Sequence, residues 1–143
     1  MNRERLSRLA TLLEGYRDRD APRFSLQNWG ETETQRRGFL WLRRHTCNTA
    51  ACAVGLACVS GVFAEDGLSY DEGNNGALTP MFDGIEGWSA VKTFFGLDQS
   101  QAVRLFAEHS YDVIEGEIAA QAVAARIRQV IALHKASAEV RDC

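Results

Sequence analysis

The sequence predicts a mainly α-helical fold, a compact single-domain bundle over residues 1–143 around one central buried helix at about residues 49–64. Three observations predict this fold class. Apolar residues recur at helical spacing near both ends of the chain. Residues 45–64 contain no Asp, Glu, Lys or Arg. The length of 143 residues and the hydrophobic fraction of 45% are sufficient for one globular domain with a sizeable core.

The first helix follows from the spacing of Leu6, Leu9, Leu13 and Tyr16, which places these four side chains on one helical face. Pro22 stops the helix because proline cannot continue the hydrogen-bond ladder. Residues 23–36 have no sustained periodicity, so we expect a loop or short extended pieces there.

The central helix should begin at an N-cap formed by Asn48 or Thr49, because either side-chain oxygen can accept from an unpaired amide of the first turn. From there to Ala64 every residue is apolar or small. A helix with no polar face is covered on all sides. We therefore expect this helix to be the centre of the core.

Residues 65–86 are rich in Gly, Asn and Asp, which favour turns. GLSYDE and ALTPMF can pair as a small β-hairpin within residues 66–82, across the turn GNNG. In that arrangement Pro80 should restrict the second strand to an edge, since it has no amide hydrogen to donate. An irregular loop is the alternative.

Three more helices are predicted towards the C-terminus. The first covers about residues 88–95 and ends at Gly96, which suits a left-handed cap. Asp98 and Gln101 have the spacing of a capping box for the next helix. The last helix runs over about residues 117–136, with an apolar stripe formed by Val123, Ile127, Val130 and His134.

Four blocks of sequence carry a resemblance: FSLQNW (24–29), the motif C-N-T-x-x-C-A-x-G-x-A (47–57), FGLDQSQAVRLF (95–106) and VAARIRQVI (123–131). With these blocks the chain resembles a group of small bacterial and phage-associated proteins of uncharacterised function. The group pattern Cys-Gly-Thr is replaced here by Cys47-Asn48-Thr49. The resemblance implies a shared fold and carries no reaction.

The clustered cysteines raise the question of a metal site. His45, Cys47, Cys52 and Cys58 are residue types that bind zinc. On one helix, however, Cys52 and Cys58 would project roughly 120° apart, so they would not face the same ion. A site formed by His45, Cys47 and Cys52 would need a further ligand such as His109. We therefore expect no metal and no cofactor.

A catalytic thiol is the second reading of the cluster. Cys52, or Cys47 just before it, would lie at a helix start, where the helix dipole favours the thiolate. His45 or His109 could act as the base. A reversible disulfide between Cys47 and Cys52 is a third reading. The flanking sequence AA-C-AV is typical of a buried, inert thiol, so we favour core packing for all three cysteines.

The charge pattern argues against several partners. The net charge is −3, and although residues 1–46 carry ten Arg against six acidic residues, the arginines alternate with acids. Two arginine pairs in residues 36–44 flank Phe39 and Trp41, a mixture that can stack on nucleic acid, but inward-pointing aromatics explain it better. We expect no nucleic-acid partner, no membrane span and, without a signal-peptide pattern, a cytoplasmic location.

The sequence thus favours a non-enzymatic interaction protein, with the partner and the oligomeric state left unspecified. Residues 23–36 and 65–86 are the expected contact surface, because long loops within small domains are often functional. The alternative is a thiol-dependent hydrolase or transferase that uses Cys52 or Cys47.

Overall fold

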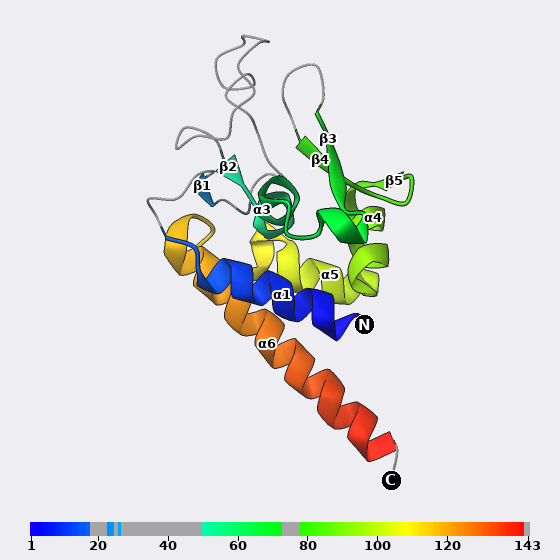
Figure 1. Cartoon of the computed structure of the whole chain (residues 1–143). Helices are drawn as coiled ribbons and strands as arrows, with labels where there is room; N and C mark the ends of the chain where they lie inside the picture. Colours follow the sequence, from blue (N-terminus) through cyan, green and yellow to red (C-terminus); the bar gives the residue numbers. More distant parts are fainter. Residues whose placement is uncertain (18–22, 25, 27–49, 73–77, 142–143) are drawn as a thin grey trace.

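The computed structural model of the protein describes residues 1–17, 23–24, 26, 50–72 and 78–141. Within these residues the chain forms five α-helices, accompanied by short strands and two 3₁₀ turns (Figure 1). In chain order the elements are α1 (Arg3–Glu14), β1 (Arg23–Phe24), β2 (Ala50–Ala51), α3 (Ala53–Ser60), η1 (Ala64–Asp66), β3 (Ser69–Glu72), β4 (Leu78–Phe82), β5 (Ile85–Glu86), α4 (Gly87–Phe95), α5 (Gln99–Phe106), η2 (Glu108–Ser110) and α6 (Gly116–Arg141).

Helix α1 forms where the leucine spacing predicts it and packs against the first half of α6 (Figure 1). The side-chain amide of Gln121 donates to the carbonyl oxygens of Leu13 and Glu14, at 3.3 and 3.2 Å. About two helical turns further along α6, Arg128 donates to Ser7 Oγ at 2.7 Å. The two helices therefore run antiparallel, with Leu6, Leu9 and Leu13 buried beneath them.

The central helix is shorter than predicted. Helix α3 begins at Ala53, not at residue 49, because Ala50–Ala51 pair as a parallel strand with Arg23–Phe24. It ends at Ser60, since Gly61 follows with a left-handed φ of 75°. The predicted caps Asn48 and Thr49 lie outside the described residues. The predicted enclosure is confirmed over residues 52–58, all of which are buried. It is wrong at Ser60, Gly61 and Ala64, which are exposed at and after the end of α3.

The predicted hairpin forms and gains a third strand. Strands β3 and β4 pair antiparallel, and β5 then pairs with β4 to give the order β3-β4-β5. Asp83 and Gly84 form the tight turn before β5, both with positive φ (52° and 80°). The prediction that Pro80 keeps its strand at an edge is wrong, because β4 is central. Strand β5 pairs only with residues 81 and 82, so it stops short of the proline.

The caps of α4 and α5 match the sequence prediction. Gly96 adopts φ 66°, and the Leu97 amide donates to the Lys92 carbonyl at 2.8 Å, closing α4. At the start of α5, Asp98 Oδ1 accepts from the Gln101 amide at 2.8 Å, while Gln101 Oε1 accepts from the Asp98 amide at 3.0 Å.

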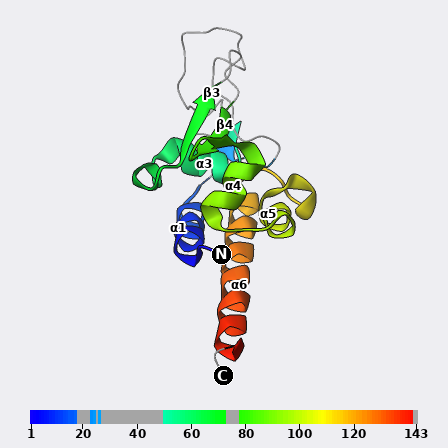
Figure 2. The ribbon, with the colours of Figure 1, turned by 90° about the vertical axis from the view of Figure 1, so that its right-hand side faces the viewer.

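Helix α6 is longer than predicted, reaching Arg141 rather than residue 136. Val123 and Ile127 of its predicted stripe are buried, whereas Val130 and His134 are half-buried. The C-terminal part of the helix extends away from the other elements (Figure 2). None of the helices in the described residues is long and apolar enough to cross a bilayer.

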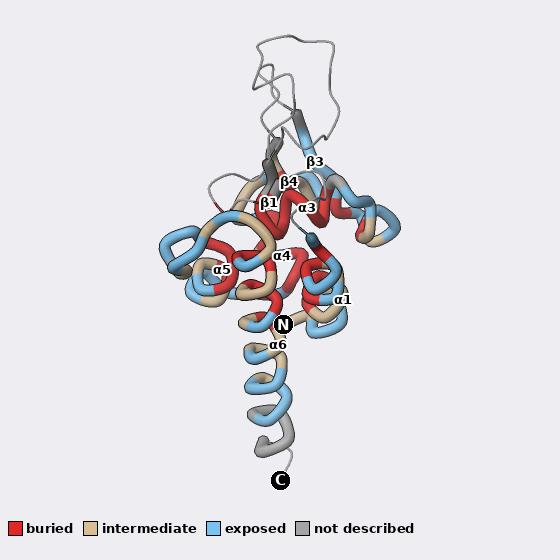
Figure 3. The backbone as a smooth tube through the Cα atoms, turned by 90° about the vertical axis from the view of Figure 1, so that its left-hand side faces the viewer, coloured by how far each residue is buried: buried red, intermediate tan, exposed pale blue. Residues whose placement is uncertain are grey.

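One cluster of buried side chains joins α1, α3, α4, α5 and α6, from Leu6 to Ile127. Figure 3 marks stretches of buried backbone in α1, α3 and α5. Its aromatic centre is Phe63, which contacts Phe94 and Phe95 edge-on, with ring centroids 5.1 and 6.0 Å apart. Helix α3 and the turn after it thus supply the middle of the core, while the sheet β3-β4-β5 lies at the side of α3 and α4.

Candidate functional site

Cys52 caps the start of α3 from inside the core. Its Sγ accepts from the Gly55 amide at 3.5 Å, and the residue is only 3% exposed. Burial raises the pKa of the Cys52 thiol to about 11, although hydrogen bonds from nearby backbone amides act in the opposite direction. The thiolate character that a helix start would favour is therefore outweighed by the loss of water.

Cys58, at the other end of α3, is in a similar environment. Its thiol donates to the Ser69 carbonyl at 3.4 Å and so joins α3 to β3. Burial, with a smaller contribution from the charge of Cys52, raises the pKa of the Cys58 thiol to about 12. Neither cysteine forms a disulfide with another described residue. At neutral pH fewer than about one in a thousand such thiols is ionised, and the thiolate is the reactive form.

The other candidate site residues are not brought to these thiols by the described structure. His109 lies exposed on η2, whereas Cys52 lies in the core. His45 and Cys47 lie outside the described residues. Within the described ranges no group of three or more His, Cys, Asp or Glu side chains could hold a metal ion.

Two hollows lie beside α1, and neither reaches the thiols of Cys52 and Cys58. One, of about 610 Å³, lies between the start of α1 and the end of α4. Arg5 lines it, donating to the Phe94 carbonyl at 2.9 Å with its guanidinium 4.2 Å from the Phe94 ring centre. The other, of about 360 Å³, lies between α1 and Val62. Neither hollow is lined by Cys52 or Cys58.

The sheet β3-β4-β5 presents a different surface. Its register aligns Ser69 with Met81 and Met81 with Glu86, and it aligns Asp71 with Thr79. Because side chains alternate along a strand, these five residues share one side of the sheet, which we call the outer sheet face. Its Ser69, Asp71 and Glu86 are exposed, and Thr79 and Met81 are half-buried.

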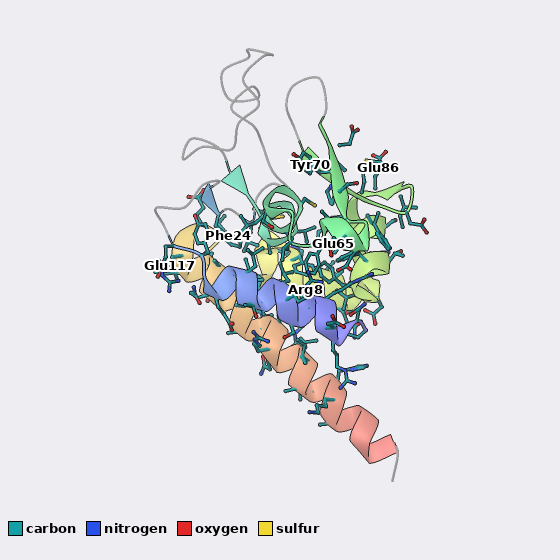
Figure 4. All side chains as sticks on the ribbon, in the orientation of Figure 1. Arg8, Phe24, Glu65, Tyr70, Glu86 and Glu117 are labelled. Carbon is teal, nitrogen blue, oxygen red and sulfur yellow. The ribbon has the colours of Figure 1, made fainter. Side chains whose placement is uncertain are left out.

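The opposite side of the same sheet faces the core. Pro80 is buried there, and the Phe82 ring meets Phe94 edge-on at 5.0 Å between centroids. Tyr70 belongs to this side by register but is 37% exposed, so it forms the rim of the sheet. Figure 4 shows Tyr70 and Glu86 on the sheet, on the far side of the molecule from Glu117 at the start of α6.

The outer sheet face lies in the most acidic part of the chain. Residues 45–91 contain six acidic residues and no Lys or Arg. Of these, Glu65 and Asp83 are exposed beside the sheet, whereas Asp66 pairs with Arg8 at 2.8 Å. Exposed carboxylates contribute negative potential to the surface around them. The sequence signals the third strand and its Glu86 only through the Asp83–Gly84 turn, a pairing typical of tight hairpins.

The sequence blocks that carry the resemblance meet in the core. Phe24, from the first block, pairs with Ala51 of the second, next to Cys52. The third block supplies the α4–α5 caps, and the fourth supplies Val123, Ala124 and Ile127 of the buried side of α6. These blocks thus determine packing and helix ends. No family model, curated protein or solved structure matches the chain, and the resemblance stays a prediction.

Proposed function

We propose that the protein is a non-enzymatic interaction protein that binds its partner through the outer sheet face. One observation carries this proposal: the sheet exposes Asp71 and Glu86 on an ordered surface, while the thiols of Cys52 and Cys58 are enclosed in the core. A rigid sheet can present side chains at fixed spacing without the ordering cost that a mobile loop incurs on binding.

The charge of this surface favours a basic protein surface as the partner. Complementary charge steers encounter and excludes wrong partners. Phosphates of nucleic acids and anionic lipid headgroups would be repelled by Asp71, Glu86 and the neighbouring Glu65 and Asp83. A cytoplasmic location is part of the proposal.

The alternative function, a thiol-dependent hydrolase or transferase, requires an accessible thiolate. The thiol of Cys52 is not accessible to solvent, and it is neutral at pH 7 because burial raises its pKa to about 11. This alternative therefore depends on Cys47 with His45, which lie outside the described residues. Labelling of the folded protein with a thiol reagent separates the two functions. We expect Cys47, Cys52 and Cys58 all to react slowly, the enclosed Cys52 and Cys58 at least about 100-fold more slowly than in the unfolded chain. One fast-reacting thiol among the three would favour the enzyme instead.

The interaction proposal is tested with two matched double variants of the full chain. Asp71→Asn/Glu86→Gln removes two carboxylates from the outer sheet face. Asp112→Asn/Glu115→Gln removes two exposed carboxylates between η2 and α6, with the same change in net charge. Each chain, carrying an affinity tag, is used to recover cross-linked proteins from cells of its source, and the recovered proteins are quantified by mass spectrometry.

We expect at least one basic protein to be recovered with the unchanged chain and with the Asp112/Glu115 variant, and its recovery to fall about tenfold with the Asp71/Glu86 variant. Recovery should also decrease in high salt, because the attraction is screened. Equal recovery with all three chains would contradict a contact through the outer sheet face. A partner lost in both variants would indicate dependence on net charge alone and would also overturn the assignment.

A further inference from the structure

We draw no further inference here: the strongest candidate, the partly apolar side of the C-terminal part of α6 at Leu133, which extends away from the other helices (Figures 1 and 2), carries nothing because the described part of the structure does not show what covers it.

Discussion

Helix α3 and the outer sheet face are neighbours in the chain but occupy opposite environments. Seven consecutive residues, 52–58, are buried in and around α3, whereas the sheet buries one side and exposes the other. Figure 3 shows this contrast as buried backbone in α3 next to exposed backbone in β3. A helix enclosed on every side requires small and apolar residues. A sheet with one solvent-exposed face requires polar and apolar residues to alternate along its strands.

The difference shows that the chemistry of a side chain depends on its environment more than on its type. A cysteine thiol in water is more reactive than a carboxylate. Cys52 and Cys58 nevertheless serve as packing groups, because burial keeps their thiols neutral. Carboxylates are common surface groups, yet Asp71 and Glu86 gain a specific arrangement from the strand register. This contrast is why the proposed contact is placed on the sheet and not at Cys52 or Cys58.

The largest expected difference between the two regions is in packing. Phe63 follows α3 and is 1% exposed between the rings of Phe94 and Phe95. Phe63→Ala should lower the free energy of unfolding by about 3–5 kcal/mol, because it leaves a cavity in the core. Tyr70→Ala, at the sheet rim, should cost less, about 1–2 kcal/mol, because 37% of the residue is already exposed in the folded chain. Urea unfolding followed by circular dichroism measures both, and similar losses would remove the distinction between the regions.

Alkaline pH should lower the free energy of unfolding through the enclosed thiols of Cys52 and Cys58. Burial raises the pKa of Cys52 to about 11 and of Cys58 to about 12, so the unfolded chain releases these protons first as pH rises. The stabilisation is complete below about pH 8.5, where unfolded cysteines titrate, and is lost as pH rises towards 11–12. Each thiol should lower the free energy of unfolding by roughly 1 kcal/mol per pH unit in that window.

The control for the alkaline experiment is Cys52→Ala/Cys58→Ala, in which the decrease between about pH 9 and 10 should become shallower. The pKa of Tyr111 is also raised by burial, to about 12, so its contribution remains in the control above about pH 10. Unfolding curves at half-unit pH steps measure the slopes. An unchanged slope in the double variant would show that the two thiols are exposed to water.

A smaller effect is expected at the surface contact between α1 and α6. Arg128 hydrogen-bonds to Glu14 at 3.0 and 3.2 Å and lowers the pKa of the Glu14 carboxyl. Both side chains are more than 40% exposed, so solvent screening limits the pair to about 0.2–1 kcal/mol. Its stabilisation is present above about pH 4.3, the ordinary pKa of glutamate, and is lost as pH falls below it.

Glu14→Gln should therefore lower the free energy of unfolding at pH 7 by less than about 1 kcal/mol and by almost nothing at pH 3. The unchanged protein and the variant are compared by urea unfolding at both pH values. A loss of free energy of unfolding well above 1 kcal/mol at pH 7 would show that this exposed pair contributes as much as an enclosed contact. Exposure would then not explain the difference between α3 and the sheet.

The smallest stability effect belongs to the outer sheet face itself. Asp71→Asn/Glu86→Gln should change the free energy of unfolding by no more than about 0.5 kcal/mol, because both side chains are exposed. Thermal and urea unfolding of this variant, beside Asp112→Asn/Glu115→Gln, measure the change. A large destabilisation would mean that these carboxylates hold the sheet together, and a binding defect would then reflect a damaged fold.

Much of the helical framework could be predicted from the residues. The leucine spacing of α1, the glycine cap of α4 and the Asp98–Gln101 capping box of α5 all depend on contacts within about six residues. The third strand was missed because β5 is two residues long, too short for a periodicity. The sequence around Pro80 also does not show that a central strand can hold this proline. The strand can do so because β5 is short and pairs only with Met81 and Phe82.

The sequence by itself determined where most helices begin and end and that the middle of the uncharged segment is enclosed, because caps and helical periodicity arise between residues close in the chain. Only the tertiary structure decided that α3 starts after a strand, since Ala50–Ala51 pair with residues 23–24, far earlier in the chain. Tertiary structure also decided the state of the thiols and the alignment of Asp71 and Glu86. Desolvation and strand register depend on which distant segments pack together, and that information is spread over the whole chain.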